Sequence, residues 1–288
     1  MSCGDNCCEC NCQPEEEVRT QVREGYSKIA AQTCCGTGVS CCGSAPQAAD
    51  QLAQTLGYSV EQLKMLPEGT NMGLSCGNPS AVAALKEGEV VLDLGSGGGM
   101  DVFIAGLKVG QSGRAIGVDM TAAMIDKARK NAKIFTERSG LSNVEFRLGE
   151  IEHLPCADSS VDVIISNCVL NLSQNKEQVW REIFRVLKPN GRVAISDMAL
   201  LKLLPPQVKQ IVNALCGCVT GAVLLEETQK LVEKVGLINV VLKQKPEYVA
   251  AMTSFKDPLY KEVINYLPKD ASVQDYLTSV EVQATKPK

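Results

Sequence analysis

The stretch of sequence that decides the fold is Val90-Val-Leu-Asp-Leu-Gly-Ser-Gly-Gly-Gly99. Its first five residues form a largely apolar run that predicts a buried strand, and the glycines after it predict a tight turn. A helical pattern begins at Met100. Glycine is needed in such a turn where the backbone takes a positive φ or approaches a ligand closely. The stretch therefore predicts a strand, a ligand-binding turn and a helix.

Strand and helix patterns alternate from this stretch onward. We expect strands at 89–94, 114–118, 144–148, 161–166 and 191–196, and helices at 100–107, 121–138 and 176–187. After Pro205 and Pro206 come two helical stretches, 206–216 and 226–235, and strand-like pieces at 238–244 and 278–285. Such alternation favours an α/β fold with a mostly parallel, doubly wound sheet. The C-terminal pieces form either an added subdomain or the antiparallel close of the sheet, and we expect an α+β cap on a single extended domain.

Three kinds of cofactor compete for the glycine turn. A P-loop needs Gly-Lys-Ser/Thr after the turn, where this chain has Met100 and Asp101. A dinucleotide fingerprint needs glycine at the sixth position from Gly95, and that position is Met100. S-adenosylmethionine has no pyrophosphate to place at the helix end. Its ammonium, sulfonium and ribose diol instead suit nearby carboxylates, so the sequence favours this cofactor.

The carboxylates that such a cofactor needs follow the predicted strands. Asp93 comes just before the turn, and Asp119 ends the next strand, where it can accept hydrogen bonds from both ribose hydroxyls. Ile151 and Glu152, after the third strand, are expected near the adenine. The complete set of predicted cofactor-binding residues is Asp93, Gly95, Ser96, Gly97, Asp119, Met120, Ile151, Glu152 and Asn167.

The amino-acid composition excludes several kinds of partner. The chain has 288 residues, of which 45% are hydrophobic and 22% charged, and its net charge is −4. These values are ordinary for a soluble globular protein and give no bulk attraction to nucleic acid or anionic membranes. No run of 18 apolar residues occurs, and the first residues lack the pattern of a signal peptide. We therefore expect a cytoplasmic, monomeric enzyme without a nucleic-acid or membrane partner.

Cysteine is abundant and histidine almost absent. The chain contains 14 cysteines, nine of them within the first 42 residues, and a single histidine, His153. Without a signal peptide, these cysteines favour thiol chemistry over a disulfide framework. Cys76, Cys168 and Cys218 come from three distant segments and could converge as a site with three sulfur ligands. Trivalent arsenic suits such a soft site and keeps a lone pair that can act as a nucleophile.

The residues around these three cysteines are distinctive. They read Gly73-Leu-Ser-Cys-Gly-Asn-Pro79, Ser166-Asn-Cys-Val-Leu-Asn-Leu172 and Cys216-Gly-Cys-Val-Thr-Gly-Ala222. Together with the glycine turn and Gly117-Val-Asp-Met-Thr121, they resemble the arsenite S-adenosylmethionine methyltransferases from about Tyr26 to Pro287. The resemblance implies a Rossmann-like class I methyltransferase fold. It also implies methyl transfer to thiol-bound As(III), supplied as arsenite or a thiol conjugate, to give mono-, di- or trimethylated arsenicals.

The same resemblance implies roles for single cysteines. Cys168 and Cys218 are expected to be the indispensable As(III) ligands and Cys76 the third. Cys76 is also expected to form a disulfide with an N-terminal cysteine, which thioredoxin or glutathione would reduce. Spacing from Tyr26 favours Cys41 or Cys42 as that partner. Cys34 and Cys35 are the other two candidates.

We expect four regions along the chain. These are a flexible Cys-rich tail at 1–13, a helical and Cys-rich loop region at 14–74, the cofactor-binding methyltransferase domain at 75–204 and the cap at 205–288.

Two other functions stay open. One is a carbon or oxygen methyltransferase for a small molecule such as a quinone, with incidental cysteines. The other is a metal-sequestering or metal-sensing protein with an idle cofactor fold.

Overall fold

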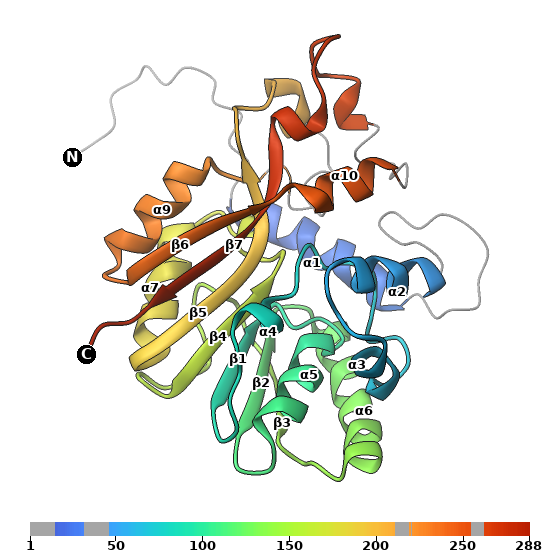
Figure 1. Ribbon diagram of the computed structural model, residues 1–288, viewed down its shortest axis with the longest axis vertical. Coiled ribbons are helices and arrows are strands. Elements are labelled where there is room, and N and C mark those ends of the chain that lie inside the picture. Colours follow the sequence, from blue (N-terminus) through green and yellow to red (C-terminus); the bar gives the residue numbers. More distant parts are fainter. Residues whose placement is uncertain (1–14, 32–45, 211–218, 220, 255–261) are drawn as a thin grey trace.

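A computed structural model describes residues 15–31, 46–210, 219, 221–254 and 262–288 (Figure 1). Its centre is a seven-stranded sheet with the order β3-β2-β1-β4-β5-β7-β6. The strands are β1 (Val90–Leu94), β2 (Arg114–Asp119), β3 (Val144–Leu148), β4 (Val161–Asn167), β5 (Leu187–Leu200), β6 (Ile238–Lys245) and β7 (Leu277–Thr285). Strands β1 to β5 pair in parallel, and β7 is antiparallel to both β5 and β6. The predicted doubly wound α/β sheet is confirmed.

Helices cover both faces of the sheet. They are α1 (Glu15–Ala31), α2 (Pro46–Thr55), α3 (Val60–Met65), α4 (Pro79–Val82), α5 (Met100–Val109), α6 (Ala122–Ser139), α7 (Lys176–Val186), α9 (Leu225–Lys234) and α10 (Pro246–Ser254). Short 3-10 helices are η1 (Leu170–Leu172), η2 (Pro206–Gln210) and η3 (Val273–Asp275). One face packs on α5 and α6 and the other on α7 and α9 (Figure 1).

The apolar pattern of the strands explains this arrangement. Alternate residues of β1 enter opposite cores: Leu92 packs with Trp180 of α7, whereas Val91 packs with Phe103 of α5. All four side chains are at most 2% exposed, which is typical of a strand buried on both faces. Such a sheet brings the carboxyl ends of β1 to β5 to one edge, where ligands of open α/β folds bind.

The C-terminal strands close the main sheet. Strand β7 runs beside β5 for its whole length, from Arg192 opposite Thr285 to Leu200 opposite Leu277. The region after residue 204 is therefore partly continuous with the sheet, which settles the open choice in favour of the antiparallel close. Among the described residues, no helix is both long and apolar enough to cross a membrane.

Two segments differ from the sequence-based prediction. Strand β5 starts at Leu187, before the strand expected at 191–196, and Asn190 within it has a φ of 61°. Its residues 192–200, which extend beyond the expected end at 196, pair with β7, a long-range contact that no local pattern reports. Of the helix predicted at 206–216, the structure describes only the 3-10 turn η2, because 211–218 lie outside the described residues.

Candidate active site

The glycine turn after β1 fits closely against the residues that follow β4. Gly95 has a φ of 69°, and a Cβ placed there would lie 2.3 Å from the Val169 side chain. Any other residue would need both an unfavourable backbone conformation and a displaced neighbour. The backbone of the turn can therefore come close to a ligand at the carboxyl edge of the sheet.

Asp119, at the end of β2, fastens this turn. Its Oδ2 accepts a hydrogen bond from the N–H of Gly97 at 2.9 Å, and its Oδ1 accepts one from the N–H of Thr121 at 2.8 Å. Burial raises the pKa of Asp119, while these two hydrogen bonds oppose the rise. The carboxylate is thus held rigidly, and it faces the space above the turn.

Asp93, in β1, places a second carboxyl group beside the turn. Its side chain is buried at 4% exposure, and burial, followed by the charges of Asp101 and Asp119, raises its pKa well above the usual value. A cation bound nearby would relieve this repulsion. The electrostatics of the turn therefore suit a ligand that carries an ammonium or sulfonium group.

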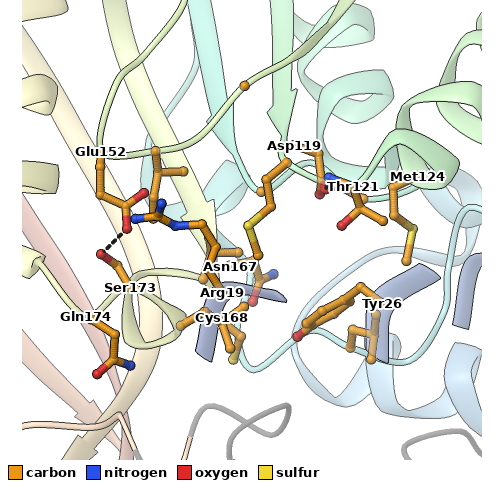
Figure 2. Close-up of a pocket in the computed structure, with 18 residues that line it drawn as sticks. Arg19, Tyr26, Asp119, Thr121, Met124, Glu152, Asn167, Cys168, Ser173 and Gln174 are labelled. Atoms are coloured by element: carbon orange, nitrogen blue, oxygen red, sulfur yellow. Dashed lines mark hydrogen bonds between the residues drawn. The ribbon is translucent and has the colours of Figure 1, made fainter. Parts of the chain in front are cut away.

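A cavity opens above the glycine turn, with about 850 Å³ of space that is partly continuous with solvent. Figure 2 shows side chains from α1, from the ends of β2 and β4 and from the segments that follow these strands converging on it. The predicted cofactor residues that line it are Gly95, Gly97, Asp119, Met120, Ile151, Glu152 and Asn167. Asp93 and Ser96 are not among the lining residues. Glu152 accepts a hydrogen bond from Ser173 at the far side of the cavity (Figure 2).

Sequence reasoning missed the contribution of α1. Arg19 and Tyr26 line the cavity, and Arg19 and Arg23 pair with Glu150, which follows β3, at 3.4 and 3.2 Å. The helical spacing of Val18, Val22, Tyr26 and Ile29 predicts the helix itself, and Val18 and Val22 are buried. The missing signal is long-range, because nothing local to 15–31 reports which part of the sheet the helix covers.

Two of the predicted sulfur ligands meet at this cavity. Cys76 and Cys168 form a disulfide, with their Cα atoms 6.0 Å apart. Cys168 lies in the turn between β4 and η1 and lines the cavity, whereas Cys76 is 1% exposed and lies behind it. The expected disulfide partner of Cys76 was an N-terminal cysteine, so this pairing with Cys168 is a different one. Cys41, Cys42 and Cys218 lie outside the described residues.

The described residues next to Cys218 approach the same place. Val219 is 1% exposed and belongs to the apolar cluster that contains Cys76 and Cys168. A Cβ on Gly221 would lie 1.8 Å from the carbonyl oxygen of Asn171 in η1, so this segment presses directly on the turn after Cys168. In the part of the chain that the structure describes, no group of three His, Cys, Asp or Glu side chains could hold a metal ion.

Asp197, near the carboxyl end of β5, is hydrogen-bonded to Asn171 in η1. Its pKa leads us to expect that the stability of the protein depends on pH. Its carboxylate accepts hydrogen bonds from Met198 N and Asn171 Nδ2, yet burial raises its pKa from 3.8 to about 6. The folded protein therefore takes up a proton between pH 6 and 4 that the unfolded chain binds only at lower pH. This uptake raises the free energy of unfolding as pH falls through that window, by roughly 3 kcal/mol.

Urea unfolding of the wild type and of Asp197→Asn at pH 4 and pH 7 measures this effect. We expect the free energy of unfolding of the wild type, relative to the variant, to be higher at pH 4 than at pH 7. Contributions of all other titrating groups cancel in the difference. A difference that stays constant with pH would contradict the prediction.

Comparison with known proteins identifies the family. A family model described as a methyltransferase domain matches residues 85–250. An arsenite methyltransferase of Halobacterium salinarum is 41% identical over 281 residues, which cover 94% of this chain and 67% of that protein. This chain belongs to the arsenite methyltransferase family. The family confirms the resemblance that the cysteine segments indicated.

More distant relatives match a smaller part of this chain. The human arsenite methyltransferase is 37% identical over 151 residues, which cover 51% of this chain and 40% of that protein. Among solved structures, an arsenic(III) S-adenosylmethionine methyltransferase from Chlamydomonas reinhardtii superposes with a TM-score of 0.61 at 31% identity, covering 85% of this chain and 74% of that one. These matches confirm the class I methyltransferase fold.

Proposed function

We propose that this protein methylates arsenite with S-adenosylmethionine as the methyl donor. The observation that carries the proposal is Cys168, which lines the same cavity as Asp119 and is joined to the buried Cys76. A soft ligand pair thus adjoins a pocket with the charges and the glycine turn that the cofactor needs. Membership of the arsenite methyltransferase family supports the same substrate.

The residues in and around the cavity offer the groups that the cofactor would need. Asp119 would accept hydrogen bonds from the ribose hydroxyls, and Ile151 with Glu152 would contact the adenine. The buried charge of Asp93 would attract the cationic end. When bound, S-adenosylmethionine supplies a sulfonium-activated methyl group with a neutral thioether as the leaving group. The protein then contributes orientation and proximity.

The proposed ligands of the methyl acceptor are cysteine sulfur atoms. Cys168, Cys218 and Cys76 would hold As(III) as thiolates, which are the form of cysteine that binds metals and metalloids. Burial of Val219 in the same cluster as Cys76 and Cys168 supports the inclusion of Cys218. Thiolate-bound As(III) keeps a lone pair and carries no proton. Attack on the methyl group therefore needs no general base, which fits a chain with one histidine.

Methylation oxidises arsenic formally from the trivalent to the pentavalent state. Two cysteine thiols would return two electrons, giving a trivalent methylated product, a disulfide and two protons. Cys76 with Cys168 is one candidate pair, because the structure holds them within bonding distance. Cys76 with Cys41 or Cys42 is the other. Thioredoxin or glutathione would reduce the disulfide by exchange, and we assign the monomeric enzyme to the cytoplasm, where thiols stay reduced.

The test is to incubate the protein with arsenite, S-adenosylmethionine and either thioredoxin or glutathione, and to separate the arsenic products by chromatography. We expect mono- and dimethylated arsenic, with S-adenosylhomocysteine formed in step with each methyl group. Without reductant, product should stop near one methyl group per chain. Mapping the disulfide formed in that single turnover distinguishes the two cysteine pairs. Absence of any methylated arsenical would overturn the proposal, and turnover on a quinone without reductant would favour the alternative enzyme.

A further inference from the structure

The side-chain amide of Asn167, the last residue of β4, joins the two cysteine segments. Its Oδ1 accepts a hydrogen bond from the backbone N–H of Cys76 at 2.9 Å and lies 3.6 Å from the Cys76 sulfur. Asn167 directly precedes Cys168 in the chain. One side chain therefore fixes the segment that carries Cys76 against the segment that carries Cys168.

The hydrogen-bond acceptors around the nitrogen of the Asn167 amide determine which way the amide is turned. Asn167 Nδ2 lies within hydrogen-bond distance of three acceptors. These are the carbonyl oxygen of Gly77 at 2.9 Å, Oη of Tyr58 at 3.2 Å and Oδ2 of Asp101 at 3.3 Å. An amide turned by 180° would bring its oxygen against the Asp101 carboxylate and its nitrogen against the Cys76 N–H, which is unfavourable on both sides. The surrounding acceptors therefore direct the oxygen toward Cys76.

Tyr58 and Asp101 are buried partners of each other, at 2% and 6% exposure. Tyr58 Oη donates to Asp101 Oδ1 at 2.9 Å. Burial and the Asp101 charge raise the pKa of Tyr58 well above its usual value, so the phenol keeps its proton and remains a donor. Asp101 lies in the first turn of α5, and neither residue lines the cavity. Their hydrogen bonds therefore act on Asn167 from behind the site.

Cys76 is also held from the opposite side. Ser279 Oγ, on β7, donates to the carbonyl oxygen of Cys76 at 2.8 Å. A Cβ on Gly77 would lie 2.5 Å from Ser196 Oγ, so the segment lies directly on β5. The N–H and the carbonyl of Cys76 are thus both bonded, so contacts other than the disulfide also hold its backbone.

We propose that Tyr58, Asp101 and Asn167 form a positioning relay that sets Cys76 beside Cys168. The three residues exchange no electrons with the substrate. They raise the effective concentration of one thiol at the other, which favours both their disulfide and their joint binding of one soft atom. What the two thiols do rests on the proposed function, whereas the relay itself can be tested without arsenite.

The test measures the Cys76–Cys168 disulfide at equilibrium in a glutathione buffer. Two glutathione thiols are oxidised for each protein disulfide reduced, and peptide mass spectrometry after alkylation quantifies both forms. We expect Tyr58→Phe and Asn167→Ala to lower the equilibrium constant for the disulfide at least tenfold, which is about 30 mV in reduction potential. Tyr58→Phe should leave affinity for S-adenosylhomocysteine unchanged.

A matched control separates positioning from general loss of stability. Asn143 is a second asparagine whose amide donates to two carbonyl oxygens, those of Gly106 and Gly110 at 2.9 and 2.7 Å, far along the sheet from the cysteines. Asn143→Ala should lower the melting temperature without changing the equilibrium of the thiol pair. An equal effect of Asn143→Ala on the thiol pair would overturn the proposal.

Asn167→Asp provides a readout that a purely structural role would not change. The new carboxylate would face Asp101, so it repels that group when charged and can donate to it when protonated. We expect the disulfide equilibrium of this variant to be impaired at pH 8 and to recover toward the wild-type value at pH 6. Wild-type equilibria in Tyr58→Phe and Asn167→Ala, or a pH-independent defect in Asn167→Asp, would overturn the relay. Failure of the wild type to methylate arsenite would instead refute the proposed function alone.

Discussion

Cys168→Ser should lose arsenite methylation, with the rate falling by about 1,000-fold or more, equivalent to ~4 kcal/mol of barrier. The serine hydroxyl is nearly isosteric but hard and un-ionised at neutral pH, so it cannot replace a thiolate toward a soft centre. Cys218→Ser should have the same effect if Cys218 is a ligand. The measurement is the initial rate of methylarsenical formation, with saturating S-adenosylmethionine and reductant.

Cys156→Ser is the matched control for this loss. Cys156 is a half-buried free cysteine whose sulfur accepts a hydrogen bond from Arg147, and it does not line the cavity. Its substitution should leave the rate within about twofold, since surface changes away from a site have small effects. Cofactor affinity of Cys168→Ser should also stay near the wild-type value. Full arsenite activity in Cys168→Ser would refute the sulfur-ligand model.

Asp119→Ala should weaken S-adenosylmethionine binding by about 100-fold. Hydrogen bonds to a charged group contribute roughly 1.5–3 kcal/mol each, and the variant would lose those to the ribose. It also leaves the N–H groups of Gly97 and Thr121 without the carboxylate that now fastens the glycine turn. Isothermal titration calorimetry with S-adenosylmethionine gives the dissociation constant directly.

Asp126→Ala removes the same charge from the following helix, α6, and serves as the control. Asp126 is exposed on α6 and does not line the cavity. Its dissociation constant should match the wild-type value, because exposed charges are screened by solvent and salt. A threefold or smaller change in Asp119→Ala would show that this carboxylate is not the ribose anchor.

Local patterns were sufficient for most of the sheet. The apolar run before Gly95 predicts β1, and the same alternation predicts β2, β3 and β4, because buried strands and amphipathic helices differ in hydrophobic period. Ser59 with Gln62 predicts a capping box, and the structure contains it. These features depend on residues that are close in sequence, where propensity and hydrogen bonding act directly.

Contacts between distant segments could not be predicted in this way. Helix α1 is held beside the cavity by the burial of Val18 and Val22 and by the ion pairs of Arg19 and Arg23 with Glu150. The network of Tyr58, Asp101 and Asn167 joins three elements that share no sequence motif. The disulfide partner of Cys76 likewise depends on how the end of β4 packs against the segment that carries Cys76. The sequence predicts candidate reactive side chains, whereas tertiary packing determines which of them meet.

Cys168 carries one further consequence. Its φ of 57° lies in the left-handed region, which costs a residue with a side chain roughly 1–2 kcal/mol relative to glycine. A glycine at this position would relax the turn and at the same time remove the sulfur. It would also break the disulfide with Cys76, and a disulfide typically stabilises a fold by roughly 2–4 kcal/mol. In the oxidised protein, thermostability and the proposed sulfur chemistry therefore favour the same amino acid at this position, in spite of its unfavourable backbone conformation.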